Sequence, residues 1–242
     1  MEAIEISKKL GIGLEMSLVT NVLLDLREDD IEKLKESVKG LNGLSVHGPF
    51  RDLIIGSMDP DIREITIDRY VETIMISQSL GAEWVLFHLN YIPLVYSSER
   101  LRRIWLNNAV NSFEQILKLA VPIHIENTYE DDPKVFKDFF ERLRSDKIFM
   151  CLDIGHAYAY SNIEISEWIT VLSPYIREVH LHESLKGKDV HAALGSGYID
   201  MSKVLTELEN NCGNDLIITL EPANDEDLQR SIEWLREHGW IK

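Results

Sequence analysis

Residues 178–191 carry three histidines and one aspartate at a spacing that suits metal binding. A short apolar strand with His180 and His182 runs into a polar stretch that ends on Asp189 and His191. Strand side chains alternate between two faces, so His180 and His182 share one face. Imidazole nitrogens and carboxylate oxygens are the usual ligands of zinc and comparable divalent ions. This stretch is therefore a candidate metal site.

Similar side chains end most of the other strands that the sequence predicts. The candidates before this stretch are His47, His88, Glu126, Asp153 and His156, and Glu221 follows it. Together with His180, Asp189 and His191 they amount to five imidazoles and four carboxylates. Charged groups are rarely buried unless they are paired or bind a metal. The set therefore predicts that cations collect at these strand ends.

The number of candidate ligands indicates more than one ion. A divalent ion takes about four to six ligands, often including water. The five imidazoles and four carboxylates therefore suit two or three ions that share bridging carboxylates. Ions about 3.5–4 Å apart are the usual means of hydrolysing phosphoesters, because they acidify water and hold the attacking and leaving oxygens in line.

Helices and strands alternate along the chain without a linker or a low-complexity segment. Strands are predicted at residues 12–18, 44–50, 84–89, 122–127, 148–154, 178–182 and 216–221. Helices are predicted at residues 3–10, 31–38, 62–80, 98–119, 133–143, 164–172, 201–209 and 225–237, with Asp29 and Asp30 capping the second. Several strands are apolar on both faces, as in a parallel sheet covered by helices.

This alternation predicts a TIM-type (β/α) barrel in a single domain, residues 1–242, with an active site at the carboxyl ends of the strands. We count seven strands, because the chain starts on the helix that would follow the first strand of a full barrel. We therefore expect an α/β barrel that lacks its first strand. An open sheet edge invites pairing, so a homodimer through this edge is a hypothesis.

Composition excludes several other classes of protein. The chain is 45% hydrophobic, which suits a buried core, and its formal charge of −16 disfavours loose binding to nucleic acid. Two cysteines offer no disulfide framework, so a reducing compartment is expected. The amino-terminal segment lacks the pattern of a signal peptide, and no apolar run reaches the roughly 20 residues that span a bilayer. We expect a cytoplasmic protein without a membrane partner.

The candidate ligands lie in the segments SVHGPF, LFHLN, IHIENT, CLDIGHAYA, VHLHES, DVHAALGSGYI and TLEP. These segments resemble the endonuclease IV family (AP endonuclease family 2) within the xylose isomerase-like TIM barrel superfamily. The resemblance implies three zinc ions held by the nine candidates named above, with Glu126 and Glu221 as bridging and catalytic carboxylates. It also implies a reaction of DNA repair, the cleavage of a phosphodiester beside an abasic site by water that the ions activate.

Alternatives to this metal site and this substrate stay open. Two zinc ions, or Mn²⁺ in place of zinc, would also suit the ligands. Only Arg27 is positive in residues 19–30, the loop that matches the DNA-contacting loop of the family, so a smaller phosphate ester is also a candidate substrate. A metal-binding scaffold without catalysis is a further alternative.

A sugar isomerase or epimerase is the main competing function. Superfamily relatives of this class use one ion, and their ligands match Glu126, Asp153, His180 and Glu221. The two glutamates would then move a proton at the carbon beside a carbonyl. Such an enzyme does not require the other imidazoles and Asp189 together, which is why the hydrolase is preferred.

A few polar residues outside this set have expected structural roles. His182 shares the face of His180 and could be a further ligand, but it is predicted instead to support the site, since ligating imidazoles need an acceptor on their other nitrogen. His124 and Cys151 are expected to be packed in the core. Glu15 is expected either to reach the rim of the site or to pair with a neighbouring charge.

Overall fold

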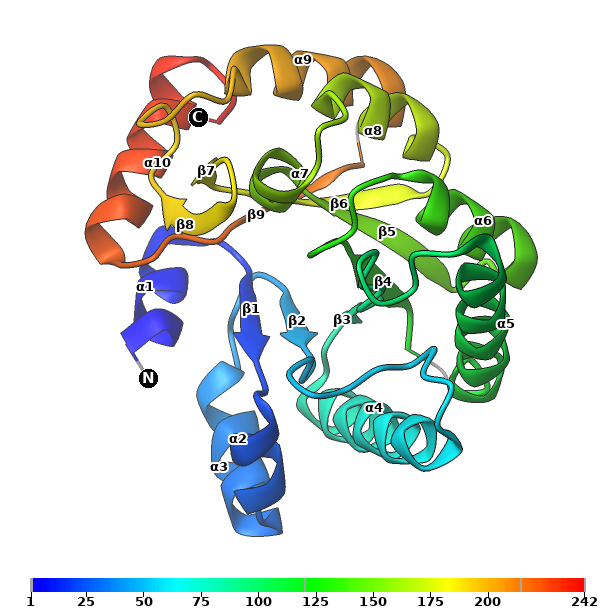
Figure 1. Ribbon diagram of the computed structural model, residues 1–242. Coiled ribbons are helices and arrows are strands. Elements are labelled where there is room, and N and C mark those ends of the chain that lie inside the picture. The colour runs from blue at the N-terminus through cyan, green and yellow to red at the C-terminus, as the bar shows by residue number, and fades with distance from the viewer. Residues whose placement is uncertain (1, 120, 214, 242) are drawn as a thin grey trace. The chain divides into compact units, whose positions relative to one another are not determined.

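The computed structural model describes residues 2–119, 121–213 and 215–241, which form an α/β protein (Figure 1). Seven strands follow the order β1-β2-β3-β4-β5-β6-β9 in one sheet, and β7 pairs with β8. The strands are β1 (Leu14–Ser17), β2 (Leu44–His47), β3 (Trp84–His88), β4 (Ile123–Glu126), β5 (Ile148–Asp153), β6 (Ile176–Leu181), β7 (Glu183–Leu185), β8 (Lys188–Ala192) and β9 (Ile217–Leu220). The helices are α1 (Glu2–Leu10), α2 (Thr20–Asp25), α3 (Glu28–Val38), α4 (Pro60–Leu80), α5 (Glu99–Ile116), α6 (Lys134–Leu143), α7 (Ile154–Tyr160), α8 (Ile165–Leu172), α9 (Met201–Cys212) and α10 (Asp225–Glu237).

The chain consists of two compact units. Unit 1 comprises Met1–Asn90, Ser98–Ile125 and Leu143–Ile148. Unit 2 comprises Tyr91–Ser97, Glu126–Arg142 and Phe149–Lys242. Helices separate the successive strands of the main sheet, as the sequence predicts, but the alternation is not strict: α2 is followed directly by α3 in unit 1, and in unit 2 α7 is followed by α8 and β6 by β7 and β8.

In unit 1 the parallel strands β1, β2 and β3 pair side by side, with His47 opposite Leu86. Capping interactions define both ends of the long helix α4. The Asp59 side chain accepts a hydrogen bond from the Asp61 N–H, and Gly81 closes the helix in the left-handed conformation. Together these elements place His47 and His88 at the carboxyl ends of β2 and β3.

In unit 2 the parallel strands β5, β6 and β9 bring polar residues to one level. Asp153 lies opposite His180, and His180 lies opposite Thr219. Helix α7 begins where β5 ends, because the Asp153 side chain accepts a hydrogen bond from the His156 N–H at 2.5 Å. One carboxylate thus joins the end of a strand to the start of a helix.

The hairpin β7–β8 follows β6 and lies beside α7 in unit 2 (Figure 1). Its antiparallel strands are joined by a tight turn at Lys186-Gly187, where Gly187 has a positive φ of 75°. The Gly187 N–H donates to the Ala159 carbonyl oxygen at 2.9 Å. The hairpin is therefore fastened to α7 and carries Asp189 and His191 on β8.

All seven predicted strands of the sheet are present, and their ends differ from the prediction by up to three residues. The prediction was wrong for residues 19–30, which form α2 and the first turn of α3 rather than a loop. Asp29 and Asp30 lie within α3 and do not cap it, since its N-cap is Arg27. Burial of Leu23, which is 1% exposed, outweighs the polar character of this stretch.

The stretch after β6 also differs from its prediction, because it forms the hairpin rather than a loop. The Lys186-Gly187 pair was the turn signal in the sequence. Among the helices described here, none has both the length and the apolar composition needed to cross a membrane.

Candidate metal centre

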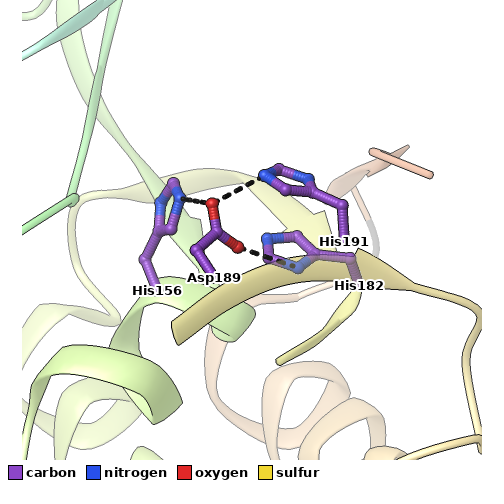
Figure 2. Close-up of side chains that lie close together, drawn as sticks. All are labelled: His156, His182, Asp189 and His191. Carbon is purple, nitrogen blue, oxygen red and sulfur yellow. Dashed lines mark hydrogen bonds and ion pairs between the residues drawn. The ribbon is translucent and has the colours of Figure 1, made fainter. Parts of the chain in front are cut away.

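Four side chains of unit 2, termed the hairpin cluster, converge in Figure 2: His156, His182, Asp189 and His191. Asp189 Oδ2 lies 2.8 Å from His191 Nε2 and 3.3 Å from His156 Nε2. Asp189 Oδ1 lies 3.7 Å from His182 Nδ1. Metal–ligand bonds of about 2.0–2.1 Å separate tetrahedral ligand atoms by roughly 3.3 Å. The spacing around Asp189 therefore fits a zinc-sized cation.

Each imidazole of the hairpin cluster has its second nitrogen beside an oxygen acceptor. The pairs are His156 Nδ1 with the Asn127 carbonyl at 2.9 Å, His191 Nδ1 with the Glu221 carbonyl at 2.9 Å, and His182 Nε2 with Asp153 Oδ2 at 3.0 Å. Such an acceptor decides which nitrogen carries the proton and leaves the other nitrogen for a cation. The surroundings of these rings are those of metal-binding histidines.

The charges of the hairpin cluster are arranged around Asp189. Burial alone would raise the pKa of Asp189, but hydrogen bonds from His156 and His191 hold it far below its usual value. Burial alone would lower the pKa of His191, but the hydrogen bond to Asp189 and a neighbouring glutamate raise it to about 9. The pKa of His156 is raised well above its usual value, because Asp153 and the other carboxylates outweigh burial. The cluster therefore attracts positive charge, as protons or as a cation.

We expect metal binding to release protons and to strengthen as the pH rises. A ligating imidazole must be neutral, and His191, whose pKa is about 9, carries a proton near neutral pH. The affinity for Zn²⁺ should therefore rise about tenfold per pH unit for each proton released between about pH 7 and pH 8.5. Calorimetry in two buffers with different ionisation enthalpies counts the protons. An affinity that is constant over this range would contradict the assignment of His191 as a ligand.

A second group in unit 2, termed the strand-end cluster, consists of Glu126, Asp153, His180 and Glu221. The distances from His180 Nδ1 are 3.2 Å to Glu221 Oε1, 3.7 Å to Glu126 Oε1 and 4.0 Å to Asp153 Oδ2. All but Glu221 are buried. The three carboxylates outnumber the one imidazole of this cluster, and their other positive partners are imidazoles of the hairpin cluster, which must lose their protons when they bind an ion. Burying the carboxylates is then costly without a cation of their own. The strand-end cluster therefore fits a divalent ion.

The two clusters of unit 2 are in contact through their carboxylates. Glu126 Oε1 lies 3.2 Å from His156 Nδ1, and Glu221 Oε2 lies 3.7 Å from His191 Nδ1. Both glutamates also lie near His180, so each contacts an imidazole of either cluster. Both glutamates meet the Nδ1 atoms of the hairpin-cluster rings, which face away from Asp189, so these contacts link the two clusters without placing either carboxylate between two ions.

In unit 1, His47 and His88 are neighbours and are both buried. Their Nε2 atoms are 3.0 Å apart, and His47 Nδ1 lies 2.9 Å from the Gly48 carbonyl oxygen. The ring of Phe50 stacks on His88 with the centroids 4.3 Å apart. Two facing imidazole nitrogens can share a proton or a cation, which is consistent with their predicted role as ligands.

The structure thus places seven of the nine predicted ligands in the two clusters of unit 2, and it places His47 and His88 together in unit 1. Ion binding by all nine stays a prediction. The sequence did not assign His182 to the ligand group, yet this residue lies within the hairpin cluster. Its alternation with His180 on one strand was the available signal.

His124 and Cys151 have the structural roles expected for them. His124 is buried and stacks on Trp84 with the ring centroids 5.2 Å apart, and Cys151 is fully buried. Glu15 accepts a hydrogen bond from the Ser45 hydroxyl at 3.1 Å, so it pairs with a neighbour on β2.

The model of the family described as xylose isomerase-like TIM barrel matches residues 4–238, so the chain belongs to this family. The match confirms the predicted fold class, and the sheet has the seven strands that were expected. Members of this superfamily are enzymes, and they include endonucleases, epimerases and isomerases.

Individual relatives differ in their stated activity. The chain is 29% identical over 204 residues to the uncharacterized protein MJ1311 of Methanocaldococcus jannaschii, which covers 80% of this chain and 69% of that protein. It is 27% identical over 197 residues to a probable endonuclease 4 of Aquifex aeolicus, which covers 71% of this chain and 66% of that protein. The crystal structure of a D-tagatose 3-epimerase-like protein is 26% identical, with a TM-score of 0.80 over 93% of this chain and 87% of that chain. Membership therefore fixes the fold but not the reaction.

Proposed function

We propose that the protein is a metal-dependent phosphoester hydrolase with two or three zinc ions, for which Mn²⁺ can substitute. The main support for this proposal is the hairpin cluster. A single-ion isomerase needs only the strand-end cluster, whereas His156, Asp189 and His191 add a second ligand set in contact with it. Clustered ions are the usual machinery for phosphoester hydrolysis. The likeness to a probable endonuclease 4 supports the same class of reaction.

The residues of unit 2 would have different roles in the proposed hydrolysis. Ions bound in the clusters would activate water and neutralise charge on the phosphate oxygens. Glu126 is fully buried and would hold the two clusters at a fixed separation. The Glu221 side chain is 22% exposed, so it is the catalytic carboxylate that substrate can reach. His47 and His88 would complete the predicted ligand set.

The proposed substrate is either abasic DNA or a smaller phosphate ester. The endonuclease likeness supports abasic DNA. The formal charge of −16 and the single positive residue of residues 19–30, Arg27, favour the smaller ester, because binding to DNA relies on Lys and Arg at the phosphates.

A sugar isomerase or epimerase is the second candidate. It is supported by the likeness to the D-tagatose 3-epimerase-like structure. It is also supported by the strand-end cluster, in which Glu126 and Glu221 flank one candidate ion site and would move a proton at the substrate carbon beside a carbonyl. This function leaves the hairpin cluster without a role.

Metal content and turnover, measured together, test the proposal. Metal-free protein is loaded with Zn²⁺ or Mn²⁺, its ions per chain are counted by mass spectrometry, and it is offered an abasic duplex, a generic phosphodiester and D-tagatose. We expect two or three ions and cleavage of at least one phosphate ester. One ion with turnover of the ketose would support the isomerase. Metal binding without any turnover would leave a scaffold and overturn both enzymatic functions.

A further inference from the structure

We propose that His182 is a positioning residue that couples the two ion sites of unit 2. It would orient Asp153 in the strand-end cluster and His191 in the hairpin cluster at the same time. This inference rests on the proposed binding of ions by both clusters, but not on the reaction that the ions serve. An ion in one site should then strengthen binding in the other.

The first contact of His182 fixes a ligand of the strand-end cluster. His182 Nε2 lies 3.0 Å from Asp153 Oδ2, and the His156 N–H donates to Asp153 Oδ1 at 2.5 Å. The Asp153 main chain is held by Asn127, whose Oδ1 accepts from the Asp153 N–H at 2.8 Å. A carboxylate oxygen has a second lone pair, so an oxygen oriented in this way still can bind a cation. His182 is therefore the nearer of two imidazoles that orient Asp153 Oδ2, since His156 Nδ1 lies 3.4 Å from the same oxygen.

The second contact of His182 is with the ring of His191. The two ring centroids are 4.0 Å apart and the ring planes differ by 17°, so the rings stack face to face. The edge of His191 is held by Asp189 Oδ2 and by the Glu221 carbonyl. Contact at both the edge and the face leaves the His191 ring a single orientation.

The same stacking argues against His182 as a ligand of the ion beside His191. An ion binds an imidazole in the plane of the ring, at about 2.0–2.1 Å from the nitrogen. Two nearly parallel planes with centroids 4.0 Å apart do not meet at that distance. By contrast, the rings of His156 and His191 are at 86° to each other and can both point at one ion. His182 is therefore assigned a positioning role, and ion binding is assigned to His156, Asp189 and His191.

Helix α7 leaves a space that the His182 ring fills. The side chain is 1% exposed, and a Cβ on Gly155 would lie 2.1 Å from His182 Cε1. Gly155 is not among the residues with positive φ, so its role here is to leave room rather than to adopt a special conformation. Any larger residue at this position must displace the ring.

A side chain shared by two sites provides a route for coupling between them. An ion that orders Asp153 also orders His182 and, through the stacked rings, His191. Coupling of this kind is reciprocal and commonly amounts to about 5-fold to 150-fold in affinity. We expect about tenfold through His182, since this route consists of one hydrogen bond and one ring contact. The contacts of Glu126 and Glu221 with both clusters are unchanged in His182 variants, and they account for any coupling of less than about twofold that remains.

The test measures Zn²⁺ affinity at the strand-end cluster with and without a working hairpin cluster. Asp189→Asn disables the hairpin site, and it should weaken strand-end binding about tenfold in the wild-type background. In a protein that already carries His182→Leu, Asp189→Asn should lower the Zn²⁺ affinity of the strand-end cluster by less than about twofold. Gly155→Ala should give the result of His182→Leu, although alanine is the better helix former. His182→Gln restores a hydrogen-bond donor toward Asp153. It should therefore preserve the Zn²⁺ affinity of the strand-end cluster but not the coupling to the hairpin cluster.

Ion counts and circular dichroism identify the outcomes that would overturn this inference. If His182→Leu folds but holds one ion fewer than wild type, His182 is a ligand and the proposal is wrong. Coupling that persists in both His182→Leu and Gly155→Ala also refutes it. If wild-type unit 2 binds a single ion, this inference and the proposed function fail together. If coupled binding is found but no phosphate ester is cleaved, only the proposed function fails.

Discussion

Replacing Glu126 or Glu221 by alanine is expected to lower turnover by on the order of 10³-fold or more while the fold persists. Each glutamate contacts one imidazole of each cluster in unit 2. Removal of either carboxylate therefore disturbs two candidate ion sites at once. Glu209→Ala, an exposed carboxylate on α9, is the matched control and should leave turnover unchanged. Full activity in either site variant would contradict the site assignment.

Thermal unfolding separates a lost ion site from a lost fold. Metal-free Glu126→Ala is expected to melt close to the temperature of the metal-free wild type, because the relief of burying one carboxylate fewer beside Asp153 and Glu221 offsets the loss of its contact with His156. When Zn²⁺ is added, the Tm of the same variant should rise much less than the Tm of the wild type. A large drop in Tm already in the metal-free variant would instead show that Glu126 serves the packing of unit 2.

The sheet was predictable because its signals are local. Each strand is a short apolar run that ends on a polar residue, and the helices between them have their own start and stop residues. Alternation along each strand then placed Asp153, His180 and Glu221 on one side. The register of Asp153 and His180 agrees with this, and Glu221 follows the last residue of β9 two positions after Thr219, which lies opposite His180. The candidate ligands followed from residue type and from position at the strand ends.

The sequence predicted that His182 supports the site, but it could not predict which side chains His182 contacts, because these contacts join segments that are distant in the sequence. Its position is set by the stacking on His191, by the hydrogen bond to Asp153 and by the space at Gly155. None of these has a pattern in the sequence alone. The same holds for α2, where burial of Leu23 in the core of unit 1 decides the structure of a stretch with weak local signals.

Removal of metal is expected to lower the Tm of the protein by on the order of 15–30 °C. A free ion concentration of about 1,000 times Kd stabilises a site by about 4.1 kcal/mol, and two sites by about 8 kcal/mol. In a protein of this size about 1 kcal/mol corresponds to about 2–4 °C. The effect is large because both clusters hold buried charge that ions would neutralise. Calorimetric melting with excess Zn²⁺ and with a chelator measures it, and Asp189→Asn should lose about half of the gain.

The pH dependence of this stabilisation has opposite signs with and without metal. In the metal-free protein the pKa of His191 is raised to about 9, above its unfolded value of about 6.5. Its contribution to stability is therefore complete below about pH 6.5 and is lost as the pH rises through about 9. With Zn²⁺ in excess the trend should reverse, because fewer protons compete with the ion for the imidazoles. Parallel curves for the two forms between about pH 6.5 and pH 9 would show that the hairpin cluster does not hold the ion, and would leave the strand-end cluster as the only metal site supported in unit 2.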